Sequence, residues 1–148
     1  MRLIISGSRS IPTGVALLIV SRMIEVHAWR PVEIVSGGCY TGPDQAAEAW
    51  ARHHRVTCRV MPAHWTVLGK RAGPERNARM VEVGTHLLAL WDNASTGTGG
   101  IIEMARRRGL PTSVLEVLPS PATALRLDEE RRAKAREKRQ RPPAARAA

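Results

Sequence analysis

The chain has 148 residues, of which 43% are hydrophobic, and its formal net charge is +10 at pH 7. This length fits one domain with a tail, and the hydrophobic content is sufficient for a core. No apolar run reaches the roughly 18 residues of a membrane span, the N-terminus lacks a secretory layout, and the two cysteines form no disulfide framework or zinc motif. We therefore expect a cytoplasmic protein that does not associate with a membrane and binds no metal or cofactor.

The positive charge is concentrated towards the C-terminus. Residues 126–148 contain nine Lys and Arg against four Asp and Glu, so this short segment carries half of the net charge. Acidic and basic residues spaced four apart support a solvated helix there. We expect 1–118 to form the folded domain and 119–148 a basic helical tail with a disordered end. Basic excess favours polyanions, so weak nucleic-acid binding by the tail is one alternative function.

Apolar runs alternate with helical periodicities along the first 118 residues. Strands are expected at 2–5, 32–35, 57–61, 86–91 and 112–117, and helices at 14–28, 45–54, 74–83 and 101–108. Near-continuous apolar strands that alternate with helices favour a parallel sheet covered on both faces. The predicted fold is therefore an α/β Rossmann-like three-layer sandwich with about five parallel strands.

Glycine-rich or long loops follow the first four predicted strands. They cover residues 6–10, 36–44, 62–73 and 92–100. Parallel strands place their carboxyl ends at one edge of the sheet, and such folds bind ligands at that edge. The four loops should therefore converge on one rim and form a shared small-molecule site.

The stretch from Ser36 to Asp44, with sequence SGGCYTGPD, joins a predicted strand to a predicted helix. Glycines let the main chain approach a ligand, and the first N–H groups of a helix attract an anion. Phosphate contacts are therefore expected from Gly37, Gly38, Thr41 and Gly42. The alternative is a tight strand-to-helix turn, and Asp44 either caps the helix or binds a ribose hydroxyl.

The other loops supply further candidate ligand groups. Arg76 and Asn77 lie in the first turn of the third predicted helix, and a planar guanidinium suits a phosphate. The alternative for Arg76 is a salt bridge with Glu75 or Glu82. Trp65 either stacks on a base or packs its loop onto the domain. The remaining candidates are Gly7, Ser8, Arg9, Lys70, Gly97, Thr98 and Gly99.

In their order along the chain, these motifs resemble the YspA/YpsA-related branch of the SLOG superfamily. The resemblance rests on Ser6-Gly7-Ser8-Arg9, Ser36-Gly37-Gly38, Thr41-Gly42-Pro43-Asp44, Pro62-Ala63-His64-Trp65, the segment 69–80 and Gly97-Thr98. That superfamily joins the DNA-processing protein DprA to the LOG phosphoribohydrolases. The resemblance covers about residues 2–117 and implies a Rossmann-like fold, a site for nucleotides or nucleotide-derived ligands, and a homodimer.

The LOG enzymes cleave the N-glycosidic bond of a nucleoside 5′-monophosphate. They are similar to this chain at Arg76 and Met80, and they carry a Gly-Thr-x-x-Glu motif whose Glu assists cleavage. Here Ile101 holds the position of that Glu, and Glu103 lies about 200° further around a helix. The leading prediction is therefore ligand binding by a sensor, carrier or sequestering protein. The alternative is a LOG-like hydrolase with Arg76 and Glu103 as catalytic residues, in which Asp44, Asp92 or Glu103 substitutes for the absent Glu.

Overall fold

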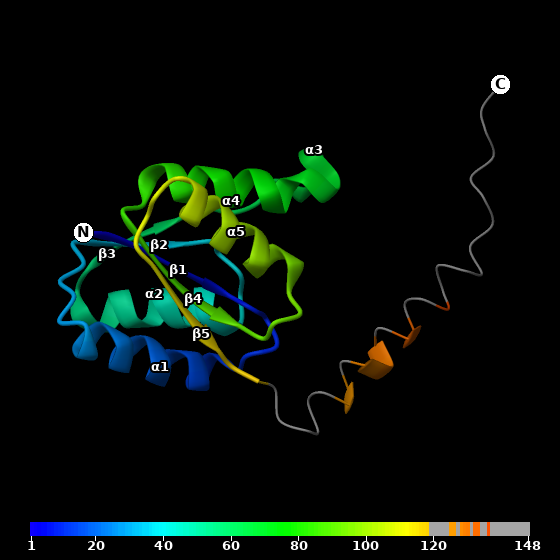
Figure 1. Cartoon of the computed structure of the whole chain (residues 1–148), viewed down its shortest axis with the longest axis horizontal. Coiled ribbons are helices and arrows are strands. Elements are labelled where there is room, and N and C mark those ends of the chain that lie inside the picture. The colour runs from blue at the N-terminus through cyan, green and yellow to red at the C-terminus, as the bar shows by residue number, and fades with distance from the viewer. Residues whose placement is uncertain (119–124, 127, 131, 134–135, 137–148) are drawn as a thin grey trace. The chain divides into compact units, whose positions relative to one another are not determined.

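The computed structural model describes residues 1–118, 125–126, 128–130, 132–133 and 136 (Figure 1). Met1–Leu118 form one compact unit and Pro119–Ala148 a second. In the second unit, Arg132 and Asp128 form the ion pair expected from their spacing, with 2.8 Å between Nη2 and Oδ2. Much of the predicted tail helix and its predicted disordered end lie outside the described residues. Nucleic-acid binding by the tail and the homodimer stay predictions.

The first unit alternates strands and helices. Its elements are β1 (Arg2–Gly7), α1 (Thr13–Val26), β2 (Glu33–Ser36), α2 (Gly42–His54), β3 (Thr57–Val60), α3 (Trp65–Leu68), the 3-10 helix η1 (Gly69–Arg71), α4 (Ala72–Val83), β4 (His86–Trp91), α5 (Thr96–Arg107) and β5 (Thr112–Glu116). The sheet order is β3-β2-β1-β4-β5, and all neighbouring strands are parallel. The predicted α/β Rossmann-like sandwich with five parallel strands is confirmed.

The core consists of two apolar layers, one on each face of the sheet. Leu3 and Ile5 of β1 pack in the layer that contains the buried residues of α1 and α2. Ile4 packs in the opposite layer with residues of α4 and α5, such as Met80 and Ile101. Successive strand residues point to opposite faces, so an uninterrupted apolar strand serves both layers. Figure 1 shows the two helix pairs on opposite faces.

The winding of the sheet reverses next to β1. The chain proceeds outward from β1 to β2 and β3, and β4 then pairs with the other side of β1, with Ile5 opposite Leu88. A reversal of this kind separates the loops at the carboxyl ends of the two central strands. The loops that follow β1 and β4 therefore border the crevice where open α/β sheets bind ligands.

Two predicted loops are shorter than expected because many of their residues are helical. In 92–100, α5 already begins at Thr96, and the Ser95 hydroxyl caps it by accepting a 3.4 Å hydrogen bond from the Thr98 N–H. In 62–73, α3 and η1 lead directly into α4 at Ala72. The glycines in these two segments suggested irregular loops. A serine cap and tertiary packing override the weak helix propensity of glycine. Consequently, Gly97, Thr98 and Gly99 lie in the first turns of α5.

Candidate functional site

A cluster of side-chain hydroxyls and one carboxylate joins the loops after β1 and β4. Asp92 Oδ1 accepts a 2.8 Å hydrogen bond from the Ser8 hydroxyl, and Oδ2 accepts a 2.6 Å bond from the Ser10 hydroxyl. The Asp92 N–H donates back to Ser8 Oγ at 3.1 Å. Ser8 is almost fully buried. These bonds hold the two loops together at the reversal point of the sheet.

The Asp92 carboxylate is held in its charged form. Partial burial acts to raise its pKa, but hydrogen bonds from the Ser10 hydroxyl, the main-chain N–H groups of Ala94 and Ser95, and the Ser8 hydroxyl together lower the pKa to about 2. The two main-chain bonds are 3.0 and 2.8 Å long. Hydrogen bonds to an ionised carboxylate stabilise the charge. Asp92 therefore supplies a fixed negative charge at the rim near neutral pH.

The first turn of α5 contacts this cluster through Thr98. Its buried hydroxyl lies 3.4 Å from Ser8 Oγ and donates to Ser95 Oγ at 3.1 Å. The amino end of a helix carries partial positive charge and free N–H groups. Thr98 thus brings a potential anion-binding end of α5 to the edge of the crevice.

The loop after β2 is occupied by the side chain of Arg76. Nη1 of Arg76 donates a 2.6 Å hydrogen bond to the carbonyl oxygen of Gly37 and lies 3.7 Å from Asp44 Oδ2. Asp44 Oδ2 also accepts a 3.2 Å hydrogen bond from the Cys39 N–H. The predicted alternative, a salt bridge from Arg76 to Glu75 or Glu82, is not formed, because Glu75 pairs with Arg79 at 2.7 Å. Arg76 therefore interacts with the stretch 36–44.

Asp44 titrates close to neutrality. Burial is the largest influence and raises its pKa to about 6, although Arg76 and the Cys39 N–H act in the opposite direction. Glu48 adds a smaller raising effect and Arg9 a smaller lowering effect. Asp44 is the third residue of α2, and its side chain ties the preceding loop to the helix. The carboxylate is thus a buried, proton-sensitive group inside the stretch 36–44.

Asn77 connects this stretch to α5. Its side chain is almost fully buried, Oδ1 accepts a 3.0 Å hydrogen bond from Arg76 Nε, and Nδ2 donates a 3.0 Å bond to the Gly97 carbonyl oxygen. A chain of polar contacts therefore runs from Asp44 through Arg76 and Asn77 to Gly97. Thr98, the next residue, continues it to Ser8. The loops after β1, β2 and β4 and the start of α4 form one polar rim.

Two glycines permit the close packing at this rim. A Cβ atom at Gly37 would lie 2.6 Å from Arg76 Cζ and 2.7 Å from Asp44 Oδ2. A Cβ atom at Gly7 would lie 2.6 Å from Pro43 Cγ at the start of α2. All three distances are shorter than side chains tolerate. The absence of a side chain at these positions is therefore what lets Arg76 enter the stretch 36–44 and lets the β1 loop meet α2.

The remaining candidates are distributed around and beyond this rim. Thr41 precedes α2, and Gly42 is the first residue of that helix. The Gly42 N–H donates a 3.0 Å hydrogen bond to Thr13 Oγ1. Gly99 lies on α5 against the Trp91 ring. Exposed positions are occupied by Arg9, Gly38 and Lys70. Trp65 is 60% exposed, and its ring lies 3.3 Å from the place of a Cβ on Gly73, so it packs over the start of α4.

Ile101 and Glu103, the two positions compared with the Glu of the LOG motif, lie on different faces of α5. Ile101 is fully buried in the core layer beside α4. The Glu103 side chain is 61% exposed and pairs with Arg107, one turn further along α5. The described hydrogen bonds connect Glu103 to none of the rim residues named above. Of the carboxylates named from the sequence, Asp44 and Asp92 lie at the rim.

The sequence reasoning missed Ser10 and the capping role of Ser95. Ser10 lies in the predicted loop after β1, but its partner Asp92 is 82 residues away. Periodicity and turn signals report only local structure, so they do not reveal this pairing. The Asp-Asn-Ala-Ser-Thr segment did contain a local signal, since Ser is a favoured N-cap residue.

The described part of the chain contains no helix long and apolar enough to cross a membrane. It also contains no group of three His, Cys, Asp or Glu residues arranged to hold a metal ion.

The parallel sheet, its reversal point and the polar rim define a Rossmann-like α/β protein with a site at the carboxyl ends of its strands. Residues 1–67 match the model of the YspA, cpYpsA-related SLOG family, YAcAr. This N-terminal segment is thus similar to the YspA-related branch of the SLOG superfamily, and the resemblance predicted from the motifs is confirmed over these residues. The match includes the β1 loop and the stretch 36–44. No curated protein and no solved structure gives a match to the chain.

Proposed function

We propose that the protein binds a nucleotide or a nucleotide-derived ligand at the polar rim, as a sensor, carrier or sequestering protein. The observation that carries the proposal is the continuous polar chain from Asp44 through Arg76 and Asn77 to Gly97. It places a guanidinium between the first turns of α2 and α5, next to the reversal point of the sheet. The match of residues 1–67 to a SLOG family model agrees with a ligand of this class.

Several donors at the rim are satisfied internally in this conformation. The Gly38 N–H donates to Ser36 Oγ, the Cys39 N–H to Asp44, and the Arg76 guanidinium to Gly37 and Asn77. A phosphate has stronger acceptor oxygens than a neutral carbonyl and suits the planar guanidinium. We expect a bound phosphate to replace some of these acceptors. Protonation of Asp44 would remove the negative charge that competes with it.

The ligand's sugar is assigned to the two rim carboxylates. Ionised carboxylates accept hydrogen bonds from hydroxyl groups, and Asp92 is ionised near neutral pH. A ligand with a phosphate near Arg76 and a ribose near Asp44 or Asp92 would satisfy donors and acceptors together. A phosphate alone or a nucleoside alone would use only half of this site.

Isothermal titration calorimetry with AMP, ADP, adenosine and inorganic phosphate tests the proposal. The nucleotides should bind more tightly than either fragment, and Arg76→Gln should weaken nucleotide binding by about tenfold or more, because it removes a charged donor. Arg22→Gln is the matched control, since among the described residues Arg22 pairs with Glu25 on the exposed side of α1. No heat with any phosphate-bearing ligand, or equal losses in both variants, would refute the proposal.

A second candidate is hydrolysis of the N-glycosidic bond of a nucleoside 5′-monophosphate. The observation that favours it is the pair of rim carboxylates whose pKa values are pushed apart, to about 6 for Asp44 and about 2 for Asp92. Such pairs are typical of acid and base roles in one site. In this candidate Asp92 stabilises the developing positive charge of the sugar, Asp44 exchanges a proton, and Arg76 anchors the phosphate.

Release of free base from AMP distinguishes the hydrolase from the binding protein. Base release should be lost in Asp92→Asn while calorimetry still shows AMP binding. Tight binding of AMP by the wild-type chain without any release of adenine would leave the binding function and exclude this hydrolase.

A further inference from the structure

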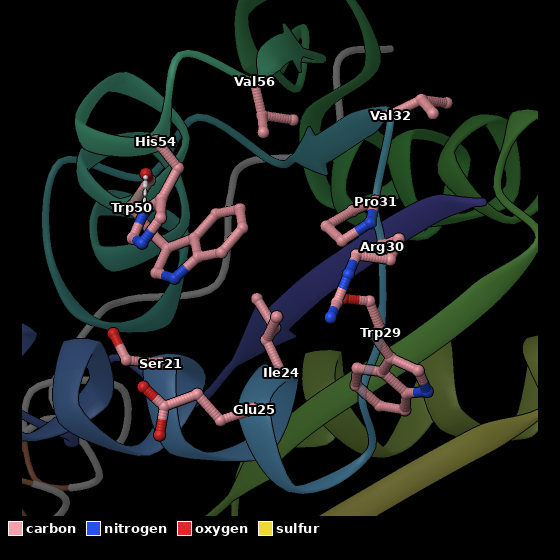
Figure 2. Close-up of a pocket in the computed structure, with 10 residues that line it drawn as sticks. All are labelled: Ser21, Ile24, Glu25, Trp29, Arg30, Pro31, Val32, Trp50, His54 and Val56. Carbon is pink, nitrogen blue, oxygen red and sulfur yellow. Dashed lines mark hydrogen bonds between the residues drawn. The ribbon is translucent and has the colours of Figure 1, made fainter.

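A cavity of about 440 Å³ lies at the edge of the sheet where the strands begin, opposite to the edge that carries the polar rim (Figure 2). It is bordered by the carboxyl-terminal parts of α1 and α2 and by residues that precede β2 and β3, where the strands begin. The volume falls within the roughly 300–1,000 Å³ of small-molecule sites. The cavity is therefore large enough for a compact ligand and is separate from the site proposed above.

Two tryptophans form the aromatic walls of the cavity. One face of Trp50 stacks on His54 with ring centroids 4.1 Å apart, and Trp29 stacks on His27 at 4.5 Å. His54 Nδ1 donates a 2.9 Å hydrogen bond to the Trp50 carbonyl oxygen, which orients the imidazole. Ile24, Pro31 and Val56 complete the apolar lining. Rigid indole walls of this kind favour a planar, aromatic ligand.

The indole N–H of Trp50 makes no hydrogen bond to the described residues and is open to the cavity. The Trp50 residue is only 6% exposed, and none of the described residues accepts a hydrogen bond from its Nε1. In Figure 2, the Nε1 edge of the ring is turned towards the open space of the cavity. The Nε1 atom is not among the buried side-chain atoms that lack a partner, so it is accessible from the cavity and can donate a hydrogen bond to an acceptor on a ligand.

Arg30 supplies positive charge at the same cavity. Its Nη1 donates a 3.0 Å hydrogen bond to the Trp29 carbonyl oxygen, and among the described residues it forms no ion pair. Figure 2 shows its guanidinium projecting into the space between the two indole rings. The lining carboxylate, Glu25, pairs with Arg22 at 3.4 Å. A negatively charged group on the ligand would therefore match the charge that Arg30 presents.

We propose that this cavity binds a small aromatic carboxylate. The ring system lies against the indoles of Trp29 and Trp50. The carboxylate accepts hydrogen bonds from the Trp50 N–H and from the Arg30 guanidinium. This ligand class joins the three observations, because a neutral aromatic would leave Arg30 unused and a non-aromatic acid would leave the indole walls unused.

Calorimetric titration of the full chain with 2-naphthoate tests this proposal. The wild type should bind, and Trp50→Phe and Arg30→Gln should each weaken binding by about tenfold, because each removes one donor to a charged acceptor. Trp50→Phe retains an aromatic ring in the core, and circular dichroism checks that the variant folds. Arg76→Gln, which removes a charge at the rim and not in the cavity lining, should leave the affinity unchanged.

The possible results separate the cavity from other sites. No binding of 2-naphthoate to the wild type at millimolar concentration would overturn the proposal. Wild-type affinity in both Trp50→Phe and Arg30→Gln would also overturn it. Weakening by Arg76→Gln alone would place the ligand at the rim and also contradict the proposal. Nucleotide binding does not enter these comparisons, so their failure leaves the proposed function untouched.

Discussion

The guanidinium of Arg76 lies where a side chain at Gly37 would have to be, and its Nη1 donates a 2.6 Å hydrogen bond to the carbonyl oxygen of that glycine. The two residues are 39 positions apart in the sequence. Their contact brings the start of α4 to the loop after β2, and it closes the rim on that side.

Gly37→Ala should displace the Arg76 side chain. A Cβ at this position would lie 2.6 Å from Arg76 Cζ and 2.7 Å from Asp44 Oδ2, so the ion pair has to rearrange. We expect about tenfold weaker nucleotide binding and a loss of about 1–3 kcal/mol in the free energy of unfolding, as for other overpacking changes. Calorimetry and urea unfolding measure the two effects.

Gly100→Ala is the matched control for this change. A Cβ on Gly100 meets nothing within 4 Å, and the residue lies inside α5. Ala is favoured over Gly in a helix, so this variant should gain up to about 1 kcal/mol. Unchanged nucleotide binding in Gly37→Ala would contradict the assigned role of Arg76.

Asp44→Asn should remove a pH dependence of stability. The pKa of Asp44 in the folded protein, about 6, lies above its usual value of 3.8, so protonation favours the folded state. This contribution is complete below the unfolded pKa and is lost as the pH rises through about 6. Between pH 4 and pH 7 the wild type should lose about 2 kcal/mol relative to Asp44→Asn.

Urea unfolding of both proteins at pH 4, 5.5 and 7 measures this difference. Asp92→Asn provides a control of opposite sign. The lowered pKa of Asp92, about 2, gives stability that is present above its unfolded pKa and is lost only as the pH falls through about 2. The difference between wild type and Asp92→Asn should therefore change little from pH 5.5 to 7. A flat curve for wild type against Asp44→Asn would mean that Asp44 has an ordinary pKa.

Asn77→Ala should weaken both the fold and the site. The side chain is 4% exposed and makes two hydrogen bonds of 3.0 Å, so its removal leaves the Gly97 carbonyl and Arg76 Nε without these partners. Buried groups left unpaired reduce stability by about 1–3 kcal/mol each. Thermal unfolding and AMP titration should both show the loss. The exposed Glu82→Ala on the same helix should change neither by more than about 0.5 kcal/mol.

Ile101→Glu tests whether the LOG-type carboxylate fits this chain. Ile101 is 0% exposed and packs in the apolar layer under α4 and α5, so a glutamate would be buried without a partner. We expect a loss of about 3 kcal/mol or more and no release of base from AMP. Ile101→Val, the packing control, should lose only about 1 kcal/mol. A stable Ile101→Glu variant that releases adenine would show that α5 can shift register.

The elements that were predicted best are those whose evidence is local. Residues 87–91 are an unbroken apolar run, and β4 spans His86–Trp91 because both faces of a central strand are covered. The start of α5 was misplaced by five residues, since glycines at 97, 99 and 100 suggested a loop. Packing of Gly99 against Trp91 and the Ser95 cap made the helix start earlier. Propensity is a weak signal that such contacts readily override.

The stretch Ser36–Asp44 and its position after a strand could be identified from the sequence by itself. Strands, glycine turns and helix starts depend on residues that are neighbours in the sequence. The alternation that defines the parallel fold and the family motifs could be identified in the same way. Only the tertiary structure decided that Asp44 is buried beside Arg76, that Ser8 and Ser10 bind Asp92, and that Glu103 faces away from the rim. These pairings join residues up to 84 positions apart, and the sheet order that brings them together depends on the packing of the whole domain.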